Sequence, residues 1–392
     1  MKRPAGTHLE YHLLVLVTLG LVAFGLVMVY SASSARALLS SDAPSYYLKR
    51  QAIYALMGLV ALVLFSRFDF HRLRHVTQPL LAVTFVLLVA VLAIGTAVNG
   101  ARRWIPIGFM NFQPSELAKL VLALWTAALL ARRPAPRTLG ELAKPIGVVV
   151  GLACALILVE PDLGTAIAVA IMVSAVLVVS GTSLRLLASA ASIAVGIVFL
   201  AIWLEPYRRE RIFSFLDPWH DPQGAGFQAV QSMIALGSGG FFGVGLGESV
   251  QKIYYLPEAS TDMIFAIVGE ELGLIGAAGV IAAFAVFAYA GFNIALQCRD
   301  PFGKRLAAAI TALICGQAAV NVSAVMGIAP LTGIPLPFVS YGGSSLVVGL
   351  AAVGILLNIA SNDAVVRETE VPDRGRRNRR TRAAGTRRRR VA

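Results

Sequence analysis

At Leu256-Pro257-Glu258-Ala259-Ser260-Thr261-Asp262-Met263-Ile264-Phe265-Ala266 the sequence changes from polar to apolar, and the apolar run then continues to about Tyr289. A run of this length crosses the hydrocarbon layer of a membrane, which takes about 20 residues of helix. Asp262 therefore stands at the N-terminal start of a predicted membrane helix. A carboxylate is costly near lipid, so an ionisable group at such a position is a candidate for a functional site.

The rest of the chain has the composition of a membrane protein. Of its 392 residues, 57% are hydrophobic and only 14% are charged, whereas soluble domains are about a quarter charged. The segments long and apolar enough to be spans lie near residues 12–31, 51–66, 77–98, 117–131, 145–159, 163–180, 186–204, 264–290, 306–328 and 345–361. We therefore predict an all-α, polytopic bundle of about ten transmembrane helices.

The predicted membrane domain covers residues 1–366 and contains one long loop, at about 205–262. Lysine and arginine are more frequent in the loops that lie inside if the N-terminus is inside, so both termini are expected in the cytoplasm and the long loop outside. The basic tail, residues 367–392, has few apolar residues and is expected to be disordered. Because it follows the last span, anionic lipids are its favoured partner, docking of a cytoplasmic protein is the alternative, and no nucleic acid is expected.

Polar and glycine-rich stretches gather on the predicted outer face. They are Asn99–Pro106 with Gln113–Lys119, the loop 205–262, and Pro330–Ser345. The last of these is too rich in proline and glycine for a helix and too apolar for water, so we expect it to re-enter the bundle and line an outward-facing cavity. In the long loop, the spacing of Phe227, Val230 and Ile234 predicts a short amphipathic helix at the membrane interface.

Asp262 has two interpretations. It could cap the helix that follows, because aspartate is a preferred N-cap residue and suits the positive end of the helix dipole. It could instead act on a substrate that arrives at the outer face. A helix start favours the charged carboxylate, which makes it a weak base, so both a general base and a metal ligand remain open roles.

The other polar candidates also have a structural alternative. Glu116 and Lys119 are three residues apart on one helix face, so they either neutralise each other inside the membrane or contact substrate. Glu160-Pro161-Asp162 either caps the next span, which we favour, or binds a cation. Arg102 and, less strongly, Lys252 are candidates for holding a phosphate, for which arginine has the suitable geometry.

Two further groups complete the set of candidates. Ser340, Tyr341, Gly342, Gly343 and Ser344 are expected to line the cavity, with the glycines allowing a sharp turn and the hydroxyls reaching substrate. Glu270 and Glu271 lie about 12 Å along the helix from Asp262, at a rise of 1.5 Å per residue. One could pair with a buried cation and the other could face the cavity, and a structural role is favoured. The three cysteines show no metal-binding spacing.

Several of these blocks resemble the signature blocks of the SEDS proteins, the family that includes FtsW, RodA and SpoVE. The blocks are Asn99–Ile105, Gln113–Lys119, Glu160–Ala166, Gly245–Leu272 and Gly333–Ser345. The resemblance extends over about residues 10–362 in matching order, and Val250–Ala259 is closer to the FtsW and SpoVE branch than to RodA. Met263 is a departure, because the family commonly has an aromatic residue there.

The resemblance implies a peptidoglycan glycosyltransferase in the cytoplasmic (inner) membrane that polymerises lipid II at its outer face, for septal wall synthesis in cell division. It implies that Asp262 is the catalytic residue. A divalent cation, Mg²⁺ or Mn²⁺, is an expected cofactor, with Asp262 or less favourably Asp162 as ligand, and no organic cofactor is expected. The implied partners are lipid II, a class B penicillin-binding protein and other division proteins.

Two rival functions fit the physical features. A lipid II flippase or other transporter would also be a bundle with a polar cavity and charges in the membrane. A non-catalytic scaffold that recruits a penicillin-binding protein would leave Asp262 dispensable. The polar stretches gather on the outer face, whereas alternating access needs polar groups that are reachable from both sides. This asymmetry favours the enzyme.

Overall fold

The structure is a computed structural model, and it describes residues 5–39, 43–98, 101–108, 110–204, 206–253 and 255–370. In this part of the chain, eight helices are long and apolar enough to cross a membrane. They cover Leu9–Ser34, Tyr46–Arg67, Phe70–Ile94, Pro114–Arg132, Leu139–Val159, Ile264–Gln297, Pro301–Val325 and Gly343–Asn362. Two shorter apolar helices, Leu163–Val179 and Leu184–Leu200, occupy the two remaining predicted spans. The prediction of a polytopic helical membrane protein is confirmed.

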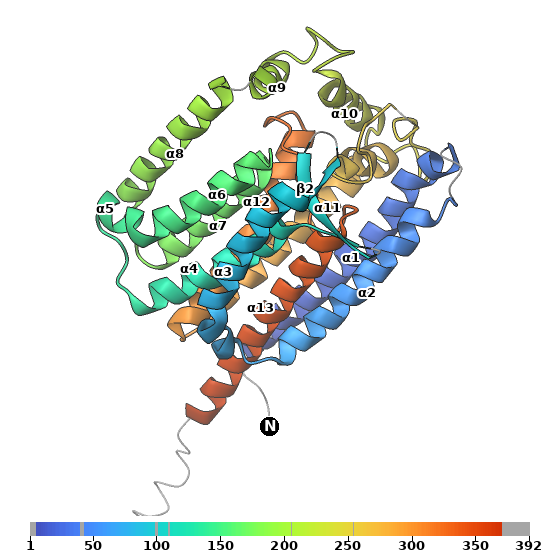
Figure 1. Ribbon diagram of the computed structural model, residues 1–392. Coiled ribbons are helices and arrows are strands. Elements are labelled where there is room, and N and C mark those ends of the chain that lie inside the picture. Colours follow the sequence, from blue (N-terminus) through green and yellow to red (C-terminus); the bar gives the residue numbers. More distant parts are fainter. Residues whose placement is uncertain are drawn as a thin grey trace, which may run out of the picture.

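The helices follow the chain order drawn in Figure 1. They are α1 (Ala5–Leu39), α2 (Tyr46–Arg67), α3 (Phe70–Ile94), α4 (Pro114–Arg132), α5 (Leu139–Leu142), the π-helix η1 (Ala143–Gly147), α6 (Val148–Val159), α7 (Leu163–Val179), α8 (Leu184–Leu204), α9 (Pro206–Leu216), α10 (Phe227–Ser238), α11 (Ile264–Gln297), α12 (Pro301–Val325) and α13 (Gly343–Glu370). The short helix predicted around Phe227 is α10.

Helix starts follow local sequence signals. Asp300 accepts a hydrogen bond from the Gly303 backbone N–H at 2.6 Å, and Pro301 occupies the first helical position of α12. Asp69 caps α3 in the same way through the His71 N–H. These caps satisfy N–H groups that have no partner inside the helix.

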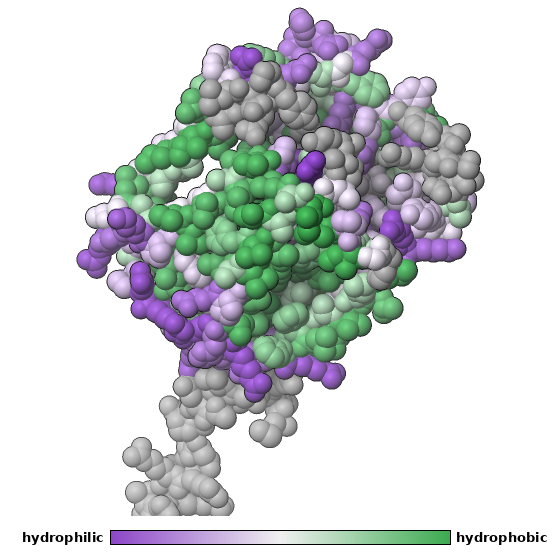
Figure 2. Space-filling view, viewed as in Figure 1, coloured by the Kyte–Doolittle hydropathy of each residue, from purple (hydrophilic) through white to green (hydrophobic). Residues whose placement is uncertain are grey.

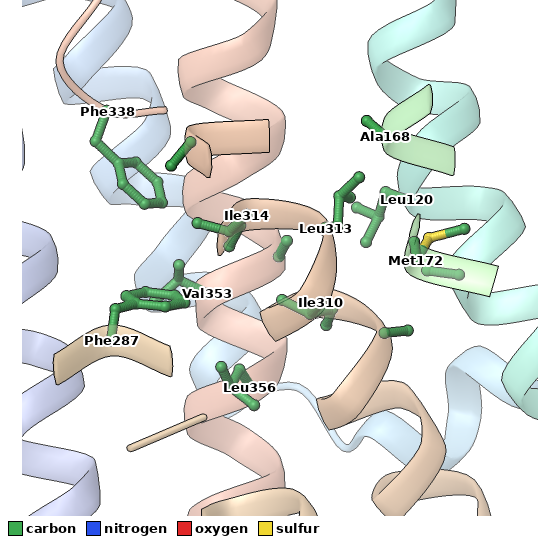
Figure 3. Packing of buried hydrophobic residues seen from close by; sticks show 14 of the residues in the cluster. Leu120, Ala168, Met172, Phe287, Ile310, Leu313, Ile314, Phe338, Val353 and Leu356 are labelled. Atoms are coloured by element: carbon green, nitrogen blue, oxygen red, sulfur yellow. The ribbon is translucent and has the colours of Figure 1, made fainter. Parts of the chain in front are cut away.

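The core of the bundle is α12, which is buried along most of its length and packs against α4, α7, α11 and α13. In Figure 3, Ile310, Leu313 and Ile314 of α12 lie between Phe287 and Val353 on one side and Leu120 and Met172 on the other. In contrast, α8 stands apart from the bundle in Figure 1 and has its main contact with α9. Its exposed apolar side chains are the kind that meet lipid.

A small antiparallel sheet lies between α3 and α4 in the otherwise helical fold. Its strands are β1 (Thr96–Val98), β2 (Ala101–Ile107) and β3 (Met110–Phe112), in the order β1-β2-β3. The predicted span 77–98 accordingly ends as a helix at Ile94. Aromatic and β-branched residues such as Trp104 and Ile105 favour strands, and Gly108, at φ 58, supplies the turn.

The structure differs from the predictions in three further places. Helix α9 was not predicted. Helix α11 extends to Gln297 and is broken at Gly273, whose φ of 64 and ψ of −161 are not helical. Helix α13 runs to Glu370, past the predicted boundary at 366, while the rest of the basic tail, with Asn99 and Gly100, lies outside the described residues.

The two ends of the bundle differ in character. Helix α1 begins and α13 ends at one end, whereas the strands, α9 and α10 lie at the opposite end (Figure 1). We call the latter the sheet end. Hydrophobic residues gather in the middle of the face seen in Figure 2, and hydrophilic residues gather toward its upper and lower ends, as expected for a chain that crosses a bilayer.

Candidate active site

Asp262 lies at the sheet end, at the end of a run of turns that we call the strap, residues 255–262. Leu256 and Ala259 of the strap are buried and fasten it to the bundle. Glu258, at φ 54, accepts hydrogen bonds from the N–H groups of Thr261 (3.0 Å) and Met263 (3.3 Å) through its backbone carbonyl. Met263 occupies the N-cap position of α11, so Asp262 stands one residue before the cap.

Asn321 of α12 joins the strap to the non-helical segment 326–342. Its Nδ2 donates to the carbonyl of Asp262 and to the carbonyl of Ile334, each at 2.7 Å. The side chain is 2% exposed, and its Oδ1 is buried without a hydrogen-bond partner. Asn321 was not among the predicted site residues, although an amide inside the apolar span 306–328 is a signal for a functional position.

The side chain of Asp262 lies beside the same segment. A Cβ atom built on Gly333 would be 3.9 Å from Asp262 Oδ2, and Thr261 Oγ1 lies 3.3 Å from Oδ1. The backbone N–H of Tyr341 donates to the carbonyl of Ser260 at 2.8 Å. The carboxylate is therefore held between the strap and the segment 326–342, at the sheet end of the bundle.

Glu116 and Lys119 form a buried ion pair on α4, with 2.9 Å between Lys119 Nζ and Glu116 Oε1. Lys119 also donates to Gln317 Oε1 at 2.8 Å, and Gln317 Nε2 donates to the carbonyl of Pro335 at 3.0 Å. The pair thus supports the segment 326–342 through Gln317, which is four residues before Asn321 on α12. A direct contact of Glu116 or Lys119 with substrate stays a prediction.

The segment 326–342 enters the bundle, as predicted, with Ile334, Leu336, Phe338 and Val339 buried. Ser340 Oγ accepts from the Leu336 N–H at 2.8 Å. The Gly342 N–H donates to Gln51 Oε1 at 3.4 Å, so this turn is tied to the start of α2.

The remaining predicted cavity residues also contact the bundle. Ser344 Oγ accepts from the Gln113 N–H (3.1 Å) and donates to the Asn111 carbonyl (3.0 Å), which links α13 to β3. A Cβ on Gly343 would lie 2.9 Å from the ring of Tyr54. Tyr341 packs edge to face on Tyr47, and burial raises the pKa of its hydroxyl to about 12. Contact of these groups with substrate stays a prediction.

Of the two neighbouring arginines on β2, Arg102 is exposed and Arg103 is partly buried. Arg103 donates to the backbone carbonyls of Glu160, at 2.8 Å, and of Pro161. Arg102 was the predicted phosphate ligand, and its exposed side chain is accessible for that role. Arg103, which was not singled out, instead holds the turn between α6 and α7.

Asp162 caps α7, as the structural interpretation predicted: it accepts from the Thr165 N–H at 3.0 Å and from Thr165 Oγ1 at 2.8 Å. Glu160 is 1% exposed, and neither of its carboxylate oxygens has a hydrogen-bond partner. Burial, together with the nearby charge of Asp162, raises the pKa of Glu160 to about 8, although Arg103 opposes the shift.

Lys252, the other phosphate candidate, is 6% exposed and faces inward. Its ammonium donates to Glu271 Oε1 (2.9 Å), Ser31 Oγ (3.3 Å) and the carbonyl of Gly247 (2.5 Å). An ammonium has three N–H donors, and these contacts use all of them within the chain. The favoured structural pairing of Glu271 with a buried cation is therefore observed.

Two cavities flank the strap. One, of about 300 Å³, lies between α9, α10 and the end of α12, and its lining includes Ala329 and Leu331. The other, of about 240 Å³, is lined by Ala32, Lys252 and residues 256–260. Pro257 lines both. The strap that leads to Asp262 is therefore loosely packed on two sides.

The comparisons with known proteins agree with this architecture. The family model for FtsW, RodA and SpoVE, described as "Cell cycle protein", matches residues 11–364. "Probable peptidoglycan glycosyltransferase FtsW" of Trichlorobacter lovleyi is 43% identical over 356 residues, covering 90% of this chain and 93% of the relative. "Stage V sporulation protein E" of Bacillus subtilis is 40% identical, covering 89% of this chain and 96% of the relative.

A solved structure is also similar to this chain over most of its length. A chain from the study "Structural coordination of polymerization and crosslinking by a peptidoglycan synthase complex" aligns with a TM-score of 0.74 and 33% identity, covering 89% of this chain and 97% of that one. The profile match and both relatives span nearly the whole membrane domain. The chain belongs to the FtsW/RodA/SpoVE family of multi-pass membrane proteins.

Proposed function

We propose that this protein is a peptidoglycan glycosyltransferase that polymerises lipid II for septal wall synthesis. The observation that carries the proposal is the placement of Asp262. Its carboxylate stands at the start of a membrane helix, beside Gly333, on a strap that Asn321 holds by the Asp262 carbonyl. Relatives that carry the name peptidoglycan glycosyltransferase FtsW match about nine tenths of the chain.

In the proposed reaction, the 4-hydroxyl oxygen of the acceptor sugar forms a bond to the anomeric carbon of the donor, and the bond from that carbon to undecaprenyl diphosphate breaks. Asp262 accepts the hydroxyl proton as general base and later releases it to water. Asp262 stands one residue before the N-cap of α11, near the positive end of the helix dipole. Exposed Arg102 on β2 is our candidate for holding the diphosphate.

A divalent cation, Mg²⁺ or Mn²⁺, would take part of its coordination at this site from water or substrate. Across the described ranges, no three His, Cys, Asp or Glu side chains lie close enough to share a metal ion. Mg²⁺ in such sites keeps several waters and binds one or two carboxylates and substrate phosphates. If such an ion takes part, Asp262 would be its protein ligand as the alternative to the general-base role, and the ion would neutralise charge on the leaving diphosphate.

For its location, we propose the cytoplasmic membrane with the sheet end outside. Helix α1 begins and α13 ends at the opposite end (Figure 1), so in this proposed orientation both face the cytoplasm. A class B penicillin-binding protein is the proposed crosslinking partner, because a relative belongs to a peptidoglycan synthase complex. Other division proteins and anionic lipids at the basic tail complete the proposed partners.

One assay distinguishes the enzyme from the transporter and the scaffold. Purified protein in liposomes, with and without a candidate penicillin-binding protein, is incubated with lipid II and Mg²⁺, and products are resolved by length. The enzyme gives polymer that is lost in Asp262→Asn. Lipid II movement across the bilayer without polymer would establish a transporter, and recruitment of the partner unaffected by Asp262→Asn, without polymer, would establish a scaffold.

A further inference from the structure

Two neighbouring glutamates on α11, Glu270 and Glu271, are fully buried and point their carboxylates at the chain that leads into the strap. Glu271 accepts from Lys252 Nζ at 2.9 Å and from Ser31 Oγ at 2.6 Å. Glu270 accepts from Ser249 Oγ and from the Val250 N–H at 3.1 Å. Both carboxylates therefore fasten residues 249–252 to α11, and Ser31 brings α1 into the same network.

The break in α11 at Gly273 holds the loop residues 243–245, which precede the fastened segment 249–252. At Gly273 the helical hydrogen bonds are interrupted, and the carbonyls of Glu270 and Glu271 accept from the N–H groups of Val244 (3.0 Å) and Gly245 (3.1 Å). A Cβ on Gly273 would lie 2.4 Å from the backbone nitrogen of Gly243. The loop backbone thus fills the break, which satisfies polar groups that a membrane helix cannot leave unpaired.

The strap is consequently fixed at its two ends and has cavities beside its middle. Lys252 fixes the entry, while Asn321 and the Tyr341 N–H hold Asp262 and Ser260 at the exit. Pro257, between these ends, lines cavities on both sides. Leu256 and Ala259 add buried contacts between these ends, but the cavities beside Pro257 leave room for the strap to shift, so the end contacts help to set the position of Asp262.

We propose that Lys252 is a positioning residue: its buried ion pair with Glu271, supported by Ser31, fixes the entry of the strap and thereby the place of Asp262. The catalytic consequence rests on the proposed function. Removal of one partner from a buried pair leaves the other charge uncompensated, whereas removal of both is tolerated far better. The pair should therefore behave as a unit, and Lys252 should act without touching substrate.

The kinetic test compares single and double variants in the lipid II polymerisation assay. Lys252→Met should lower kcat about 100-fold, the loss that a misplacement of about 1 Å can cause, with KM for lipid II unchanged. Glu271→Met should do the same. The double variant Lys252→Met/Glu271→Met should recover much of the lost rate. Lys49→Met, the same change at an exposed lysine of α2, should leave the rate unchanged.

The opposite kinetic pattern would overturn the proposal. If Lys252 held a substrate phosphate directly, Lys252→Met would raise KM, Glu271→Met would leave the rate near wild type, and the double variant would be as impaired as Lys252→Met alone. Independent losses that multiply in the double variant would also overturn it, because residues that work through one contact are not additive.

A second readout tests the strap without catalysis. Spin labels at Tyr255→Cys and Ile328→Cys, both exposed positions, report the strap against the end of α12 in a chain whose native cysteines are alanines. Wild type should give a narrow distance distribution, Lys252→Met a broad one, and the double variant a narrow one again. An unchanged distribution in Lys252→Met would overturn the proposal. If the distance distribution broadens in Lys252→Met and narrows again in the double variant, but the wild-type protein makes no polymer, the proposed function is overturned and the positioning role of Lys252 is supported.

Discussion

Asn321 gives the sharpest test of how the strap is held. Asn321→Leu keeps the branched shape and the number of non-hydrogen side-chain atoms and removes the two hydrogen bonds to the carbonyls of Asp262 and Ile334, each 2.7 Å long. A buried carbonyl left without a partner costs about 1–3 kcal/mol, so the two together cost roughly 2–6 kcal/mol. Asn321 Oδ1 is itself buried without a partner, and its removal recovers part of this. We expect a net loss of about 2–4 kcal/mol in the free energy of unfolding.

The same variant should also slow polymerisation, because Asp262 loses the contact that fixes its backbone. A displacement of about 1 Å at a catalytic group can cost about 100-fold in rate. Asn321→Asp should be worse than Asn321→Leu, since it places a carboxylate, which can only accept, against two carbonyl oxygens. The assays are denaturant unfolding in detergent micelles and lipid II polymerisation on the same preparations.

Thr311→Val on the same helix is the matched control. It removes a buried hydroxyl that bonds only to the carbonyl of Ala307 within α12, so it should leave the polymerisation rate unchanged. The reasoning is refuted if Asn321→Leu retains wild-type rate and stability, or if Asn321→Asp is tolerated better than Asn321→Leu.

Two further changes test other parts of the site. Burial raises the pKa of Glu160 from 4.5 to about 8. Between pH 4.5 and 8, Glu160 loses its proton in the unfolded chain but keeps it in the folded chain. The free energy of unfolding of the wild type therefore falls as the pH rises through this range. Glu160→Gln should therefore raise the Tm more at pH 8 than at pH 5, and an equal shift at both pH values would contradict this. Gly164 lies at the start of α7, and a Cβ added there would be 2.1 Å from Ile334 Cγ1. Gly164→Ala should therefore lower the Tm and the polymerisation rate. An unchanged Tm would contradict this, because it would show that the two segments relax without cost.

Much of the architecture follows from hydropathy and local signals. The apolar runs predict the spans, the charge before one of them singles out Asp262, and the prolines and glycines of 330–345 predict a segment that enters the bundle without a helix. The spacing of apolar residues predicts α10. In each case the signal lies within a short window of sequence, so no knowledge of distant partners is needed.

The features that were missed depend on contacts between distant segments. Asn321 holds Asp262 from 59 positions away, and Gly273 breaks α11 only because the backbone of 240–245 fills the gap. A single glycine in an apolar run does not reveal such a partner. Arg102 and Arg103 are adjacent on a strand, where successive side chains point to opposite faces, and no local pattern indicates which face meets the turn at Glu160.

The most direct test of the central claim is the rate of lipid II polymerisation by Asp262→Asn, measured beside wild type on preparations with equal unfolding temperatures. The substitution keeps the size of the side chain and removes its ability to accept a proton as a carboxylate. The proposed mechanism predicts glycan polymer from the wild type and none from Asp262→Asn. Polymer at a near-normal rate from the variant would contradict the assignment of Asp262 as the catalytic residue.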